Sequence, residues 1–90
     1  MDFLNYHHLR YFWAVAKEGG LTKAGVKLHV SQPTISAQIQ ALEGALGAKL
    51  FRHSGRNLAL TETGQHVLGF AEEIFSLGQD LLNSVKQRPT

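Results

Sequence analysis

The sequence predicts a mainly α-helical domain that carries one small β-hairpin and ends in a single long helix. Apolar residues recur at helical spacing in four segments. Between the third and fourth segments, two short β-compatible runs flank a turn that contains Gly and Asn. The 90 residues suffice for one small domain with a modest core, and a hydrophobic content of 43% is typical of a folded chain.

The first helix is expected over about residues 6–17. Asn5 can cap its N-terminus, and Gly19 and Gly20 are expected to end it in the left-handed conformation. Aromatic and apolar residues share one face of this helix, which indicates that they pack in the core: Tyr6, Leu9, Phe12, Trp13 and Ala16.

A second, short helix is expected over about residues 23–28, with Thr22 as its N-cap. Its inward-facing residues are expected to be Ala24, Gly25 and Leu28. A tight turn at His29 and Val30 then leads into the third helix. Small residues on the second helix would let the third helix cross it closely.

The third helix has the most informative pattern. Ser31 is a suitable N-cap, and Pro33 lies in the first turn, where a missing N–H is tolerated. The helix is expected to end between Gly44 and Gly47. One face carries an apolar stripe of Ile35, Ile39, Leu42 and Leu46. The opposite face is small, uncharged and rich in hydroxyls and amides: Pro33, Thr34, Ser36, Ala37, Gln40 and Ala41.

This uncharged face predicts a recognition helix for DNA. Small side chains allow close approach, and Ser, Thr and Gln can hydrogen-bond to base edges in the major groove. A short helix, a tight turn and a second helix make a helix-turn-helix, expected here over about residues 22–43. The alternative is an ordinary surface helix built from weak helix formers.

A two-stranded hairpin, or wing, is expected over about residues 50–60. Arg52, His53 and Arg56 lie near its tip, where basic side chains can reach phosphates or a minor groove. The alternative is that they only keep a loop soluble. The fold class that follows is a winged helix-turn-helix with a long C-terminal dimerisation helix.

The last helix is expected over about residues 62–86, capped by Thr61 and stopped by Pro89. Its apolar residues form a heptad seam of Val67, Ala71, Ile74, Gly78, Leu81 and Val85. A helix roughly 35–40 Å long exceeds what so small a domain can cover, so the seam is expected to form a homodimer interface. Packing entirely within one chain is the alternative.

The charges are unevenly divided along the chain. Residues 1–61 contain seven Lys and Arg against three Asp and Glu, whereas residues 62–90 contain two against four. Between Gly19 and Thr61 the only acid is Glu43. A basic front half indicates a polyanionic partner. We therefore expect a DNA-binding domain over residues 1–61 and a linker or dimerisation helix over residues 62–90.

Several classes of protein are disfavoured by composition. The absence of cysteine excludes disulfide scaffolds and thiolate zinc sites. The five histidines lack metal-ligand spacing, and no catalytic set is visible, so no metal, no cofactor and no enzyme activity are expected. The longest apolar run, residues 11–16, is too short to span a membrane, and no signal peptide is visible. A soluble, cytoplasmic protein is expected. A protein–protein module built on the long helix is a rival that leaves the acid-poor front half unexplained.

The segment LTKAGVKLHVSQPTISAQIQALEGALGAKLFRHSGRNLALTETG, residues 21–64, resembles the DNA-binding domain of bacterial LysR-type transcriptional regulators. HVSQPTIS, followed by LE..LGAKLFR and LTETG, carries the resemblance. It implies a winged helix-turn-helix, a dimerising linker helix and an interrupted palindrome in double-stranded DNA as the partner. Family chains continue into a ligand-sensing domain. This sequence ends at Thr90, so that effector-binding domain is expected to be absent, in a fragment or a natural short form.

The resemblance also implies roles for particular residues. The family's base-reading positions correspond to Gln32, Pro33, Thr34 and Ser36. Its positions on the DNA backbone, including the wing, correspond to Thr22, Lys23, Ser31, Gln38, Arg52, His53 and Arg56. Ala37 and Gln40 depart from the family, in which Arg is frequent at both positions, so fewer cations should enter the groove.

The resemblance also allows a tetramer in a full-length protein and RNA polymerase as a further partner. The opening NYHHLRYFWAVAKEG and the closing AEEIFSLGQDLL look most like the subgroup that activates a sodium/proton antiporter.

Overall fold

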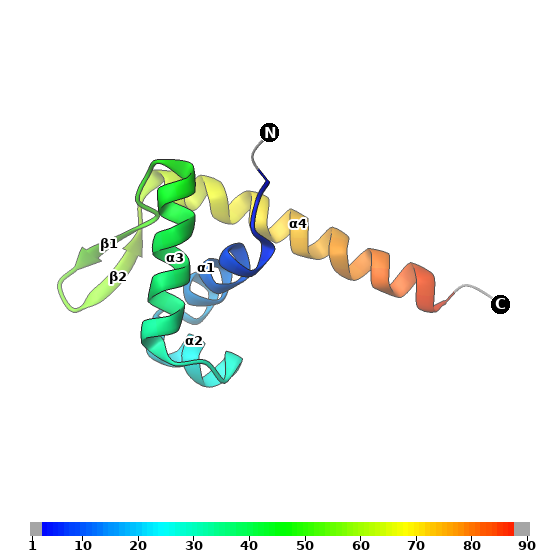
Figure 1. Cartoon of the computed structure of the whole chain (residues 1–90), viewed down its shortest axis with the longest axis horizontal. Coiled ribbons are helices and arrows are strands. Elements are labelled where there is room, and N and C mark those ends of the chain that lie inside the picture. Colours follow the sequence, from blue (N-terminus) through cyan, green and yellow to red (C-terminus); the bar gives the residue numbers. More distant parts are fainter. Residues whose placement is uncertain (1–2, 88–90) are drawn as a thin grey trace.

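The computed structural model describes residues 3–87 and has the predicted winged helix-turn-helix architecture (Figure 1). Its elements follow in the order α1 (Tyr6–Glu18), α2 (Leu21–Leu28), α3 (Gln32–Leu46), β1 (Phe51–Ser54), β2 (Asn57–Leu60) and α4 (Glu62–Lys86). The wing formed by β1 and β2 projects to one side, and the second half of α4 extends away on the other. The predicted stop at Pro89 and the outermost residues of the two expected domains lie outside the described range.

Helix α1 is the centre of the domain, because α2, α3 and α4 all pack against it. Its buried residues meet the apolar stripe of α3, and single residues from α2, the segment before β1 and α4 complete the core. The core consists of Leu9, Phe12, Ala14, Val15, Ala24, Ile35, Ile39, Leu42, Leu50 and Ala71. The wing joins this core through Phe51, whose ring centroid lies 5.3 Å from that of Phe12.

Three of the four predicted helix caps are confirmed. The side chain of Asn5 accepts a hydrogen bond from the His8 N–H at 3.0 Å. Ser31 and Thr61 accept from the N–H groups three residues later, at 3.4 and 2.9 Å. The fourth prediction is wrong: α2 begins at Leu21 after the extended Gly20, so Thr22 lies inside the first turn and caps nothing. Of the two glycines that end α1, only Gly19 is left-handed, with φ 85°.

Two residues assigned to buried faces are exposed. Tyr6 retains 62% of its accessible surface and Leu46 retains 45%. Tyr6 is the first residue of α1 and Leu46 is the last of α3, so each lies on the correct face but beyond the reach of the packed neighbour. The Tyr6 ring lies beside the Phe75 ring of α4, with centroids 6.2 Å apart.

The turn between α2 and α3 has a Schellman arrangement. His29 is left-handed with φ 58°, and the N–H groups of His29 and Val30 donate to the carbonyls of Val26 and Gly25 at 3.4 and 3.1 Å. A Cβ added at Gly25 would lie 2.9 Å from the Val30 carbonyl oxygen, which is too close for an unstrained contact. Glycine therefore allows this tight connection, across which α2 and α3 pack against each other.

The first half of α4 is fastened to the domain. Lys17 on α1 forms an ion pair with Glu72 at 3.1 Å, and this ammonium group lowers the pKa of the Glu72 carboxyl below its usual value. At the start of α4, Gly64 is buried against the Leu50 backbone. Although α4 runs for 25 residues, no helix within the described residues is long and apolar enough to cross a membrane.

Gly64→Ala should lower the free energy of unfolding by about 1–3 kcal/mol, because the added Cβ would overlap the Leu50 carbonyl. Gly69→Ala in the same helix is the matched control. Nothing lies within 4 Å of a Cβ at that exposed position, so this change should stabilise the chain by about 0.5–1 kcal/mol. Urea unfolding measures both changes, and equal stability of the two variants would contradict the close packing at Gly64.

Candidate nucleic-acid interface

The outward face of α3 is exposed and carries no charge. Pro33, Thr34, Ala37, Gln40 and Ala41 are exposed, and Ser36 is half-buried. The one charged residue of α3, Glu43, points toward the segment before β1 and keeps only 11% of its side-chain surface exposed. The face therefore offers hydroxyls, amides and methyl groups for contact.

Hydrogen bonds already orient several of the predicted contact residues. The Gln32 side-chain amide donates to the Thr22 hydroxyl at 3.3 Å, which joins a predicted base-reading residue to a predicted backbone-contacting residue. The hydroxyls of Ser31 and Thr34 lie 2.8 Å apart at the start of α3. The Ser31 hydroxyl thus accepts one N–H at the start of α3 and holds the Thr34 hydroxyl beside it, whereas the Gln32 side chain is exposed and that of Ser36 is half-buried.

The wing separates its basic residues onto two faces. Arg52 pairs with Ala59 and His53 pairs with Leu58, so these neighbouring residues of β1 point to opposite sides of the sheet. His53 lines a cleft toward α3, and Arg52 points away from that cleft. Arg56 lies in the two-residue loop after Gly55, whose φ of 64° fits glycine at the first position of a II′ hairpin turn. Of the predicted trio, only Arg56 is at the tip.

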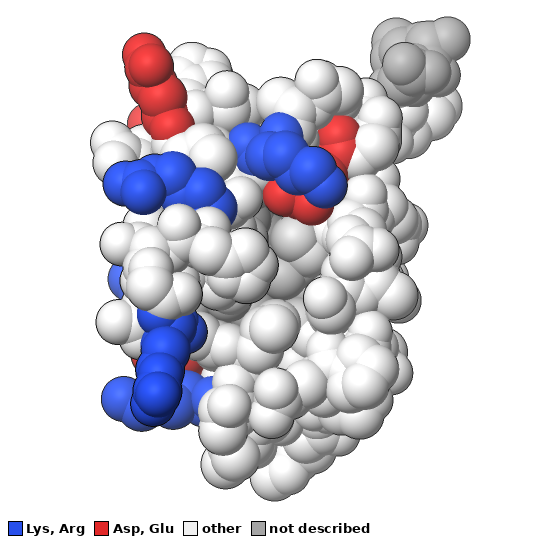
Figure 2. Space-filling model, turned by 90° about the vertical axis from the view of Figure 1, so that its left-hand side faces the viewer, with Lys and Arg blue, Asp and Glu red and all other residues white. Residues whose placement is uncertain are grey.

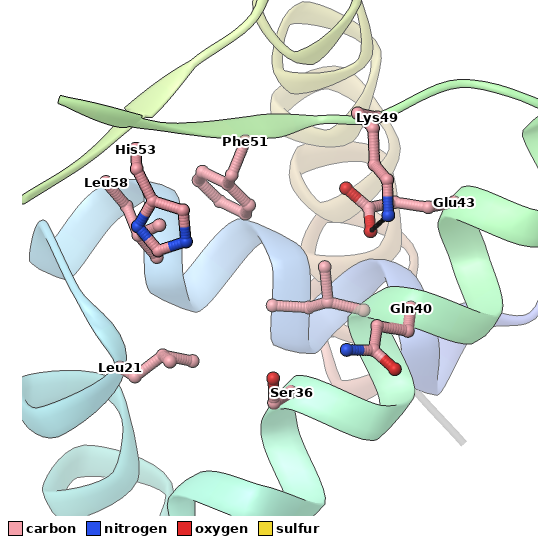
Figure 3. Close-up of a pocket in the computed structure, with 9 residues that line it drawn as sticks. Leu21, Ser36, Gln40, Glu43, Lys49, Phe51, His53 and Leu58 are labelled. Atoms are coloured by element: carbon pink, nitrogen blue, oxygen red, sulfur yellow. Dashed lines mark ion pairs between the residues drawn. The ribbon is translucent and has the colours of Figure 1, made fainter.

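A cleft of about 340 Å³ separates α3 from the wing (Figure 3). Ser36 and Gln40 face it from α3, while Phe51 and His53 face it from β1. Its remaining lining residues are Leu21, Ile39, Glu43, Lys49 and Leu58. The uncharged face of α3 thus continues into a largely apolar cleft toward the wing.

Glu43 has a contact that the sequence-based prediction missed. Its Oε2 accepts a hydrogen bond from the backbone N–H of Leu50 at 2.8 Å, and its Oε1 lies 3.8 Å from the Lys49 ammonium group. The sequence does contain a signal, since Glu43 is the single acid between Gly19 and Thr61. In the fold, this carboxylate joins α3 to the segment that enters the wing.

On the face that bears the wing tip, Lys and Arg side chains lie along the left and upper parts, and a broad area without charged side chains fills the lower right (Figure 2). The exposed cations of α2, the wing and the segment before it are Lys23, Lys27, Lys49, Arg52 and Arg56. Within the described residues, no group of three or more His, Cys, Asp and Glu side chains is placed to hold a metal ion. This arrangement suits a long polyanion. Uncharged groups of the polyanion could lie against α3, while its charged groups lie near the Lys and Arg side chains beside the α3 face.

The model of the "Bacterial regulatory helix-turn-helix protein, lysR family" matches residues 6–65. The chain belongs to this family. It is 43% identical over 88 residues to the transcriptional activator protein NhaR of Escherichia coli (strain K12), a match that covers 98% of this chain and 29% of NhaR. It is 45% identical over 71 residues to the HTH-type transcriptional regulator TfdT of Cupriavidus pinatubonensis, covering 79% of this chain and 31% of TfdT. The lysR-family chain described here therefore spans less than a third of these relatives, which are transcriptional regulators.

Solved structures of the same family share the fold. The BenM DNA-binding domain, in a complex with catB site 1 DNA, superposes with a TM-score of 0.88 at 36% identity and 93% coverage of both chains. The CbnR DNA-binding domain, in a complex with DNA, gives a TM-score of 0.82 at 38% identity, covering 92% of this chain and 95% of that one.

The predicted seam of this lysR-family chain divides into two halves. Ala71 has no exposed surface, so its assignment to a dimer interface is wrong, because α4 uses it to pack on its own domain. Val67 and Ile74 are also packed against the core, whereas Gly78, Leu81 and Val85 are exposed. Other large apolar residues are more than half exposed beside them: Phe70, Leu77 and Leu82.

The exposed apolar surface of α4 continues into a cleft of about 300 Å³. Residues of the segment before α1 and of α1, α3 and α4 line this cleft: Leu4, Leu9, Leu42, Leu46, His66, Val67, Phe70 and Ile74. Unpartnered apolar surface therefore runs from the domain along the free end of α4.

Proposed function

We propose that this chain binds double-stranded DNA sequence-specifically, as the DNA-binding domain of a transcriptional regulator. The observation that carries this proposal is the exposed, uncharged face of α3, which lies beside a wing that presents Arg52 and Arg56. A helix of this shape fits a major groove, and cations beside it fit the flanking phosphates. The DNA complexes of the BenM and CbnR domains, which share this fold, support the proposal.

In the proposed complex, different residues bind different parts of the DNA. Gln32, Pro33, Thr34 and Ser36 read base edges from the N-terminal half of α3, the usual reading end of such a helix. The backbone and wing contacts come from Thr22, Lys23, Ser31, Gln38, Arg52, His53 and Arg56. Because Ala37 and Gln40 are uncharged, attraction to phosphates comes mainly from the margins of the interface.

We also propose that two copies pair through the free half of α4. The proposed interface consists of the exposed apolar residues of this half: Phe70, Leu77, Gly78, Leu81, Leu82 and Val85. Antiparallel pairing of two helices, each about 37 Å long, places two α3 helices on one side of the dimer. Helix-turn-helix dimers read half-sites roughly 34–36 Å apart or a multiple of that distance, which fits an interrupted palindrome.

The wider setting follows from the relatives. We assign the chain to the antiporter-activator subgroup, and its similarity to the transcriptional activator protein NhaR over 98% of this chain supports an activating role. A protein of that subgroup would act on the chromosome in the bacterial cytoplasm. Its full-length form would carry an effector-binding domain, assemble as a tetramer and contact RNA polymerase.

Replacing Gln32 or Ser36 with Ala should reduce sequence discrimination by about 1–3 kcal/mol for each lost base contact, while the fold stays intact. DNA sites selected by the wild-type chain from a random pool, together with scrambled sites, provide the titration. Ser76→Ala on the exposed side of α4 is the control, and it should leave both affinities unchanged. If both α3 variants still discriminate as the wild type does, α3 is not the reading helix.

Arg52→Ala and Arg56→Ala should weaken binding to every DNA sequence and reduce the slope of log K against log salt by about one unit each. Each change removes one phosphate contact and the counterion that it releases. Lys86→Ala, which removes a cation at the far end of α4, should not alter the slope. Unchanged slopes in both wing variants would show that the wing makes no contact with DNA.

Leu81→Asp should convert a dimer into a monomer that keeps its fold, because Leu81 is exposed within one chain and buried only in the proposed pair. An unpaired buried carboxylate costs about 3–5 kcal/mol. Ser76→Asp adds the same charge on the opposite side of α4 and should leave the dimer intact. Sedimentation equilibrium is the measurement, and a wild-type chain that is monomeric at high micromolar concentration would refute the interface.

A further inference from the structure

The backbone of Leu50, the residue before the wing, is held from two sides. Its N–H donates to Glu43 on α3 at 2.8 Å, and its carbonyl accepts the N–H of Thr61, the cap of α4, at 3.0 Å. The Thr61 hydroxyl also donates to the carbonyl of Lys49 at 2.7 Å. Because the Leu50 side chain is fully buried, the entry to β1 has little freedom to shift.

A carboxylate in this position is unexpected on electrostatic grounds. Glu43 is the single acid in a basic stretch from Gly19 to Thr61, and negative charge near DNA repels phosphates. Its charge is compensated within the fold by the Leu50 N–H and by Lys49, whose ammonium group is 3.8 Å away (Figure 3). A neutral residue at position 43 would avoid this repulsion of phosphates. The presence of a carboxylate there therefore needs a structural explanation.

We infer that Glu43 is a positioning residue that sets the distance between the recognition helix and the wing. The inference rests on the proposed function. The hairpin begins at Phe51, directly after Leu50, and its four cross-strand pairs make it a single unit. A shift at Leu50 therefore moves Arg52 and Arg56 together relative to α3. The hydrogen bond from Leu50 to Glu43 keeps these cations on the phosphates that flank the base pairs contacted by α3.

Two conservative substitutions separate the reach of this side chain from its charge. Glu43→Gln keeps the chain length and an oxygen that can accept the Leu50 N–H, but it removes the charge. Glu43→Asp keeps the charge but is one methylene shorter. If Glu43 acts only through repulsion, E43Q should tighten DNA binding and E43D should resemble the wild type. If it acts by positioning, E43Q should keep the wild-type salt slope and E43D should lose the contribution of the wing.

The experiment titrates the wild-type chain and the two variants, E43Q and E43D, with duplex DNA over a range of salt concentrations. E43D should lower the salt slope by about one to two units, the share of the two wing cations. In the E43D background, Arg52→Ala and Arg56→Ala should cause a smaller further loss than in the wild type. Ser36→Ala, on α3 itself, should reduce affinity by the same factor in both backgrounds.

The outcomes distinguish this inference from the proposed function. A wild-type chain without salt-dependent DNA binding would overturn both. If the wild-type chain binds DNA, two results would overturn the positioning role alone. One is a wild-type salt slope in E43D, and the other is an affinity loss from Arg52→Ala and Arg56→Ala that is as large in E43D as in the wild type. Either result would count even if E43D melts at a lower temperature. If E43D does not fold, E43Q is compared with the wild type: an equal affinity and an equal salt slope support positioning, and tighter DNA binding refutes it.

Discussion

The backbone of Leu50 is the point on which the arrangement of the domain depends. Its N–H binds α3 through Glu43, its carbonyl binds the first residue before α4, and its side chain fills the core. The Gly64 backbone packs directly on that carbonyl, where any side chain would intrude. Helix α3, the wing and α4 are therefore all held by one short segment, so the position of each depends on the other two.

The division of α4 into two halves follows from the small size of the domain. The inner half has core partners and an ion pair from Lys17 to Glu72, so it is part of the globular unit. The outer half extends past α1, and its leucines and valine find no partner among the described residues. The core packing of the inner half fixes the direction of the whole helix. The apolar surface of the outer half remains available for association.

Local chemistry accounts for the features that were predictable from sequence. The caps at Asn5, Ser31 and Thr61 depend on residues within one helical turn, so the sequence is sufficient to locate them. The hairpin depends on a short turn with a glycine at the position that needs positive φ. The order of elements and the apolar faces follow from the same short-range patterns.

The features that were missed depend on where a neighbouring element ends. Periodicity places Tyr6 and Leu46 on apolar faces but cannot show that their partners stop short of them. Ala71 fits a heptad seam equally well whether the facing helix is α1 of its own chain or α4 of another chain. The hydrogen bond from the Leu50 N–H to the Glu43 carboxylate spans seven residues and a change of chain direction, so no local rule predicts it.

The neutral face of α3 has a consequence for how such a protein would search a chromosome. Nonspecific residence on DNA is governed by the number of phosphates neutralised, whereas discrimination depends on contacts to base edges. Here the cations lie at the margins of the α3 face, and α3 itself contributes none. On the proposed function, each nonspecific encounter would be brief, and the chain would sample distant sites by frequent dissociation and rebinding. Its selectivity would then vary little with ionic strength, because contacts to base edges release no counterions.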